Sequence, residues 1–262
     1  MSDSLSTWLA LREAADARAR SVSLLETVVR HLPHARPLRM LDLGTGTGSN
    51  IRYLSPRLPR PHEWLAVDRD PALLAEQPQG IERRCLELGP LDPDIFAGRH
   101  FVTASALLDL VSKDWIGLLA ERCRAAAASV VFALTYDGRS SCSPAEDEDE
   151  MVRLLFNQHQ RRSDKGFGLA AGPDAVPLTI DAFDASGFVV LHEHSDWDLA
   201  PEEDTMQREL INGWAEAAIE VDGSKARTIR DWLARRIAHV DEGRSRIRVG
   251  HQDIGAWIRG SA

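Results

Sequence analysis

A glycine-rich stretch near residue 45 carries the residue types and spacing that most clearly predict chemistry. It reads MLDLGTGTGSN from Met40 to Asn50, with glycine at every second position from Gly44 to Gly48 and a carboxylate, Asp42, two residues earlier. Glycine adopts positive φ angles and allows a ligand to approach the backbone where a side chain would block it. A glycine turn between a strand and a helix presents bare backbone amides to a ligand in open α/β sheets. The stretch therefore predicts a ligand-binding loop.

Two cofactors bind at loops of this kind, and the spacing discriminates between them. A dinucleotide typically requires glycines in the order GxGxxG, so that a pyrophosphate fits against the turn. Here the order is Gly44-x-Gly46-x-Gly48, and Asp42 would repel a pyrophosphate but suit a ligand with a positive amine or sulfonium. S-adenosylmethionine carries both groups. Asp68 ends the next predicted strand, EWLAVD, where a carboxylate can accept hydrogen bonds from both ribose hydroxyls.

The pattern LDLGTGTG followed by VD resembles class I S-adenosylmethionine-dependent methyltransferases. The resemblance is close over residues 40–137 and rests on strand order alone beyond them. It implies that the three glycines pass under the methionine moiety and the ribose. It also implies that Asp42 helps to hold the amino group through backbone or water, and that Asp68 holds the ribose.

The same resemblance implies four further cofactor contacts. Glu87, at the end of the predicted third strand, corresponds to the acid near the adenine amino group, and Leu88 to its neighbouring ring contact. Ser105 would line the methionine side, and Arg12 on the leading helix would meet the cofactor carboxylate. Two alternatives stay open. Glu87 is also compatible with a surface carboxylate, and Arg12 with an ordinary helical ion pair to Asp16.

The acceptor site is expected in the segment NQHQRRSDKGFG, which follows the predicted fifth strand. His159 is the candidate general base, because its ordinary pKa near ~6.5 suits removal of a hydroxyl proton. The other expected acceptor-site residues are Asn157, Lys165, Phe167 and Trp197. These residues favour methylation of a small molecule at a hydroxyl oxygen. N-methylation and an RNA or protein substrate remain alternatives, as do a nicotinamide-dependent oxidoreductase and a non-catalytic binding protein.

No metal centre is expected. His192, His194 and Asp196 alternate along a predicted strand and share a face, but a fourth ligand is missing from the pattern. The three cysteines show neither a CxxC pair nor a Cys/His spacing typical of zinc sites.

Strands and helices alternate from residue 38 to residue 136, and the strands are too apolar to have a solvated face. This pattern predicts one α/β domain over 1–262, with a seven-stranded, mostly parallel, Rossmann-like sheet and helices on both faces. Residues 1–36 are expected to form a helical cap. Residues 138–176 are too long for a simple connection and too polar for a core, so we expect a helical and loop lid there.

Net charge argues against a nucleic-acid partner. The 262 residues carry a formal net charge of -9, whereas phosphate backbones are bound by clustered Lys and Arg. The basic stretch 225–248 is interpreted as a solvated helix face, with an anion-binding patch as the alternative, and the acidic stretch 144–150 as the first turn of a helix. No signal peptide or membrane span is predicted, so we expect a soluble cytoplasmic protein.

Overall fold

The computed structural model describes residues 2–164 and 166–259, and its central element is an eight-stranded sheet. The strand order is β3-β2-β1-β4-β5-β8-β6, with β7 paired to β8 beside this path. The strands are β1 (Leu38–Leu43), β2 (His62–Asp68), β3 (Glu82–Cys85), β4 (Phe101–Ser105), β5 (Ser129–Ser143), β6 (Phe188–His194), β7 (Trp197–Leu199) and β8 (Arg246–Ile258). β1 to β5 are parallel, and β8 runs antiparallel between β5 and β6. The predicted mostly parallel, Rossmann-like α/β sheet is confirmed.

The expected number of strands was one too low for the part of the chain described. We predicted a single strand over FVVLHEHSDW, and the structure divides this segment into β6 and β7. Between them the Ser195 amide donates a hydrogen bond to the His251 carbonyl at 2.9 Å. Both strands pair with β8. An apolar, alternating segment predicts extended backbone well but does not reveal such an interruption.

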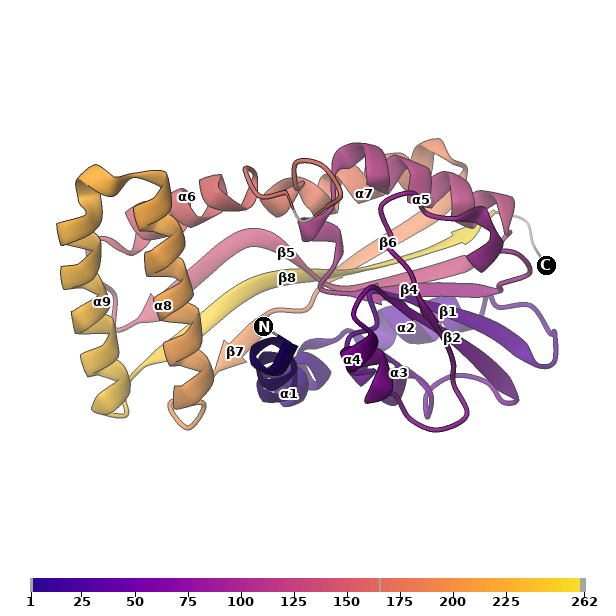
Figure 1. Ribbon diagram of the computed structural model, residues 1–262, viewed down its shortest axis with the longest axis horizontal. Helices are drawn as coiled ribbons and strands as arrows, with labels where there is room; N and C mark the ends of the chain where they lie inside the picture. The colour runs from indigo at the N-terminus through magenta and orange to yellow at the C-terminus, as the bar shows by residue number, and fades with distance from the viewer. Residues whose placement is uncertain (1, 165, 260–262) are drawn as a thin grey trace.

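Helices cover both faces of the sheet, as predicted (Figure 1). On one face α5 (Lys113–Ala125) and α7 (Ala175–Ala185) bury a cluster that includes Ile116 and Phe183. On the other face α2 (Val22–Val29), α3 (Ser49–Leu54) and α4 (Pro71–Ala75) bury Leu25 and Ile51. The central strands β1, β2 and β4 and the first half of β5 are buried on both sides, which is why they read as apolar runs, whereas the edge strand β3 is exposed.

The far ends of β5 and β8 leave the sheet core and carry a second group of helices (Figure 1). These are α6 (Asp149–Gln160), α8 (Asp204–Val221) and α9 (Ala226–Asp241), which with β7 we call the helical lobe. The lobe has its own apolar cluster, including Trp214 and Trp232. We expected the fifth strand to end at Tyr136, but β5 continues to Ser143 in pairing with β8. The predicted lid, 138–176, therefore begins as strand and continues as α6.

The acidic and basic stretches pair with each other inside the helical lobe. Arg235, Arg236 and His239 of α9 contact Glu146, Glu148 and Asp149. The Arg236 side chain is fully buried, and its Nε donates to Asp149 Oδ1 at 2.9 Å. At these positions the basic stretch is neither a solvated face nor an open anion patch, because its charges are satisfied by carboxylates brought in from α6 and the residues before it.

A buried carboxyl group lies just beyond β4. Asp109 sits in a short turn of 3-10 helix, Leu108–Leu110, and its Oδ1 atom has no hydrogen-bond partner. Burial raises the pKa of Asp109 to about 6, since the charged form loses its hydration.

No helix in the described ranges is long and apolar enough to span a membrane.

Replacing Asp149 tests the charge pairing in the helical lobe. Asp149→Ala leaves the buried Arg236 guanidinium with the Pro144 carbonyl as its remaining partner, so the free energy of unfolding should fall by about 3–5 kcal/mol. Urea denaturation measures this change. The neighbouring exposed Asp147→Ala should stay within about 0.5 kcal/mol of the wild type. Equal, small effects of both variants would contradict the pairing.

Asp109 makes stability depend on pH in a defined direction. Because its pKa is higher in the folded than in the unfolded state, its favourable contribution is present below about pH 4 and is lost as pH rises through about 6. The variant Asp109→Asn lacks this titration. Relative to the wild type it should gain about 2–3 kcal/mol in unfolding free energy between pH 4 and pH 7. A pH-independent difference, measured by denaturation at each pH, would exclude the assignment.

Candidate active site

A cavity of about 1240 Å³ lies at the carboxyl ends of β1, β2 and β4, with helix α1 (Ser2–Ala19) along one side. Figure 1 shows α1 between α8 of the helical lobe and α4 of the sheet layer. The walls come from the glycine loop, the ends of β2 and β4, α1, and the first turns of α8. The predicted site residues that line the cavity are Arg12, Gly44, Gly46, Asp68, Leu88, Ser105 and Phe167.

The glycine loop forms the floor nearest to α1. Gly44, Gly46 and Gly48 all have positive φ angles, of 62°, 52° and 85°. A Cβ atom at Gly46 would lie 3.0 Å from the Leu9 side chain of α1, and one at Gly48 would lie 2.4 Å from Gln77 Oε1. The first two glycines line the cavity, whereas Gly48 is the N-cap of α3. Glycine is thus required both by backbone conformation and by close packing.

Asp42 lies beneath this loop, fully buried. Its Oδ2 accepts a hydrogen bond from Thr45 Oγ1 at 2.6 Å, and its Oδ1 accepts one from Asn50 Nδ2 at 2.5 Å. Burial raises the pKa of Asp42 to about 6, while these two hydrogen bonds oppose the rise. The side chain does not line the cavity, so it acts on a ligand through the loop that it supports.

Asp68 stands at the end of β2, in the cavity wall. The Gly46 amide donates to its Oδ2 at 2.9 Å, and the Asp70 amide donates to its Oδ1 at 3.0 Å. Two backbone donors therefore fix the orientation of the carboxylate. Each carboxylate oxygen has a further lone pair to offer to a ligand hydroxyl.

Ser105, at the end of β4, is held from behind by an arginine that sequence reasoning did not assign to the site. Arg20 Nη2 donates to Ser105 Oγ at 2.9 Å, and its Nη1 donates to Asn50 Oδ1 at 2.6 Å. The guanidinium is buried and lies over the Tyr53 ring at 4.6 Å. The sequence contains a weak signal for a role of Arg20 in the site: it follows Arg12 by eight residues, a spacing that places both on one face of a helix. Since Ser105 Oγ accepts this bond, its own proton is directed to another acceptor.

Arg12 and Trp197 form one unit on the side of the helical lobe. The Arg12 guanidinium lies 5.0 Å over the Trp197 ring, and its Nε donates to Asp16 Oδ2 at 2.9 Å. Asp16 Oδ1 also accepts from Trp197 Nε1 at 3.0 Å. Trp197 is buried behind Arg12 and does not line the cavity. Arg12 and Asp16 thus form the i,i+4 ion pair considered as an alternative from the sequence. This pair is part of a larger cluster with Trp197 that faces the cavity.

Three further predicted residues, His159, Asn157 and Glu87, are not among those that line the cavity. His159 is on α6, where its Nε2 lies 2.9 Å from Glu220 Oε2 of α8. Asn157 is buried; it accepts a hydrogen bond from the Tyr136 hydroxyl at 2.7 Å and donates to the Gly138 carbonyl at 2.9 Å. Glu87 is not among the lining residues, although Leu88 is. His159 and Asn157 lie outside the lining because both are on α6, and the extension of β5 places this helix in the helical lobe. Lys165 lies outside the described residues.

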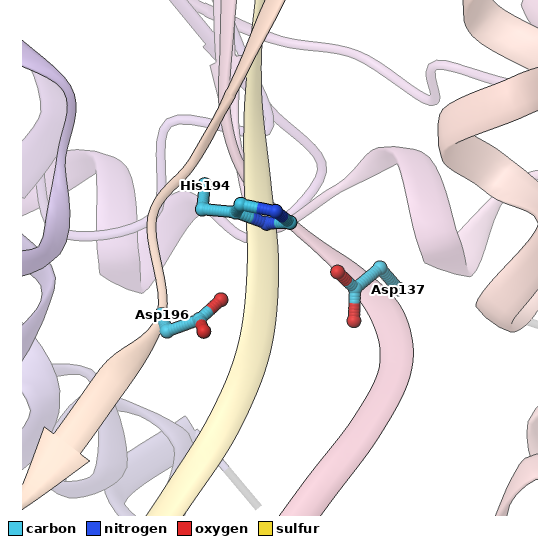
Figure 2. A group of neighbouring side chains, drawn as sticks. All are labelled: Asp137, His194 and Asp196. Carbon is cyan, nitrogen blue, oxygen red and sulfur yellow. The ribbon is translucent and has the colours of Figure 1, made fainter.

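A second group of ionisable side chains lies where β5 passes β6 and β7 (Figure 2). One ligand atom each of Asp137, His194 and Asp196 falls within 4.8 Å of the others. The Arg139 guanidinium bonds to all three: to Asp137 Oδ2 at 2.6 Å, to Asp196 Oδ1 at 2.7 Å and to His194 Nδ1 at 3.0 Å. The positive charge that these acidic side chains attract is thus supplied by Arg139. His192 instead contacts Gln252.

Comparison with known proteins yields a match at the level of structure. No protein-family model matches the sequence, and neither does any curated protein. A putative type II methyltransferase from Anaeromyxobacter dehalogenans aligns with a TM-score of 0.52 at 16% identity, covering 90% of this chain and 95% of that one. A putative methyltransferase from Bacillus halodurans has a TM-score of 0.48 at 11% identity, covering 88% and 96%.

At these identities a structural likeness establishes the fold alone. The chain therefore has the fold of the class I methyltransferases.

Proposed function

We propose that this protein is an S-adenosylmethionine-dependent methyltransferase that acts on a small organic acceptor. The observation that carries the proposal is the Asp68 carboxylate in the cavity wall, fixed by the Gly46 and Asp70 amides. A carboxylate with free lone pairs next to a glycine loop suits a ribose diol. The same loop, with Asp42 beneath it, favours a ligand without a pyrophosphate, and so argues against a nicotinamide dinucleotide.

The residues around the cavity fit this cofactor. Leu88 lies beyond Asp68 and offers an apolar contact for the adenine ring, and Gly44 and Gly46 leave space for the ribose and methionine chain. The Ser105 hydroxyl, polarised by Arg20, can donate to the cofactor carboxylate. When bound, S-adenosylmethionine supplies an electrophilic methyl group on a positively charged sulfur. The protein's part is to hold the acceptor in line with that group and to exclude water.

The cavity has room for both reactants. Its volume of about 1240 Å³ exceeds the ~300–1,000 Å³ typical of a pocket for one drug-sized ligand. Its lining includes the apolar side chains of Leu5, Trp8, Leu11, Ala106, Leu107, Leu110 and Phe167. This composition suits a small organic acceptor better than a polyanion. We keep 1–36 as the proposed cap and the part of 138–176 around Phe167 as the proposed lid of a single domain.

Transfer to a hydroxyl oxygen, the acceptor favoured by the sequence, requires a base. His159 is engaged with Glu220 and is remote from the cavity lining. Glu209 is a lining carboxylate that accepts no hydrogen bond from the described residues, so it is the proposed base for a hydroxyl acceptor. N-methylation is the alternative, since an amine that enters uncharged already has a free lone pair.

Asp68 variants test the cofactor assignment. Asp68→Ala removes the charged acceptor of two ribose hydrogen bonds, so the Kd for S-adenosylmethionine should rise about 30- to 150-fold in isothermal titration. Asp68→Asn, which retains one carbonyl oxygen, should show a smaller loss. Asp114→Ala, on the exposed side of α5, is the matched control and should bind as the wild type does.

Two results would contradict the assignment. One is an unchanged Kd in Asp68→Ala. The other is a thermal midpoint of the wild type that rises with NAD and not with S-adenosylhomocysteine.

A further inference from the structure

Arg12 is a cation of the cavity lining that uses only part of its hydrogen-bonding capacity within the described residues. Its side chain is 12% exposed, and its Nε is bound to Asp16. Its Nη1 and Nη2 atoms form no hydrogen bond or ion pair within the described ranges, and the residue lines the cavity. A guanidinium has five N–H donors, so four of them remain available on the cavity side.

The position of these donors is fixed by the surrounding protein. One face of the guanidinium lies over Trp197, and the Nε edge is held by Asp16, which is itself anchored by Trp197 Nε1. Rotation of the side chain is therefore restricted from two directions. The edge formed by Nη1 and Nη2 remains, and its two parallel N–H groups match the two oxygens of a carboxylate.

Arg12 lies on the side of the cavity that faces the helical lobe. Ala15 and the neighbouring Trp8 and Leu11 pack into the core of the helical lobe, whereas Leu9 contacts the glycine loop. At the methionine end of the cofactor site a different arginine, Arg20, already reaches Ser105. Arg20 does not line the cavity and acts on it through Ser105, whereas the Arg12 guanidinium lines the cavity directly.

Resting on the methyltransferase proposed above, we propose that Arg12 binds a carboxylate group of the methyl acceptor rather than the carboxylate of the cofactor. The acceptor class is a small organic acid with an apolar body. Trp8, Leu107, Leu110 and Phe167 provide the apolar surface for that body. A buried guanidinium with unfilled donors gains most from a ligand that is itself charged and planar.

The acidic residues near Arg12 leave its Nη1 and Nη2 groups available to a ligand carboxylate. Asp16 occupies the Nε edge and is fully engaged by Arg12 and Trp197. Asp109 interacts with Arg12 electrostatically, and burial raises its pKa to about 6. Glu209 is exposed on α8 and forms no hydrogen bond with the described residues. Glu209 is the group that would instead favour an amine, so the experiment must compare both charges.

The test uses three probes with one apolar body and different head groups: 3-phenylpropionate, 2-phenylethanol and phenethylamine. Wild-type protein is first titrated with S-adenosylhomocysteine, and each probe is then titrated into the saturated complex. We expect 3-phenylpropionate to bind at least about tenfold more tightly than the other two. Failure of S-adenosylhomocysteine to bind would reject the proposed function itself.

Variants then assign the preference to Arg12. Arg12→Gln should abolish the preference for the carboxylate and leave the Kd for S-adenosylhomocysteine within about twofold of the wild-type value. Arg12→Lys retains the charge but not the planar fork, so it should keep a reduced preference. Arg230→Gln, at an exposed arginine of α9, makes the same charge change and should retain the full preference. Thermal midpoints of all variants establish that they are folded.

Several results would overturn the inference while leaving the proposed function intact. These are equal or tighter binding of the alcohol or the amine, no binding of any probe, or a retained carboxylate preference in Arg12→Gln. In Arg12→Gln, the affinity for S-adenosylhomocysteine could also fall by as large a factor as the affinity for 3-phenylpropionate. That result would indicate that Arg12 binds the cofactor carboxylate instead.

Discussion

The hydrogen bond from the Gly46 amide to the Asp68 carboxylate joins the loop after β1 to the end of β2, and the cavity depends on it. It fixes the carboxylate in one orientation and sets how far the loop stands above the sheet. Asp42 supports the same loop from below through Thr45 and Asn50. Because Leu9 packs directly onto Gly46, the height of the loop also determines where α1 lies. A local backbone contact thus sets the shape of a much larger site.

Helix α1 transmits this geometry to the rest of the molecule, because it contacts both halves of the fold. Glu13 pairs with Arg52 of α3 on the sheet side, and Asp16 binds Trp197 of β7 on the other side. Arg18 pairs with Glu203, which precedes α8. The cavity lies between these attachments. The relative placement of the sheet and the helical lobe is therefore coupled to the walls that a ligand would touch.

The part of the site that could be predicted from sequence is the part encoded locally. The glycine loop and Asp68 follow strands whose apolar patterns are unambiguous, so their meeting at one edge of the sheet follows from a parallel topology. Arg20 could not be placed in this way, because its partners Asn50 and Ser105 are 30 and 85 positions away. His159 was selected for its chemistry and its proximity in sequence to a glycine-rich turn. Its position depends on β5 continuing through residues 137–143, DGRSSCS, whose sequence shows no alternation of apolar and polar residues.

The order in which the strands are synthesised differs from their order in the sheet. β8 is the last strand along the chain, yet it lies between β5 and β6, and in the described residues β6 pairs with no other strand. During translation β6 therefore has no neighbour until residues 246–258 have left the ribosome. Until then β5 also presents an open edge, and open strand edges promote association between chains. Completion of the sheet in the cell is thus tied to residues 246–258, and until they are available the nascent chain carries two open strand edges that are paired with β8 in the finished structure.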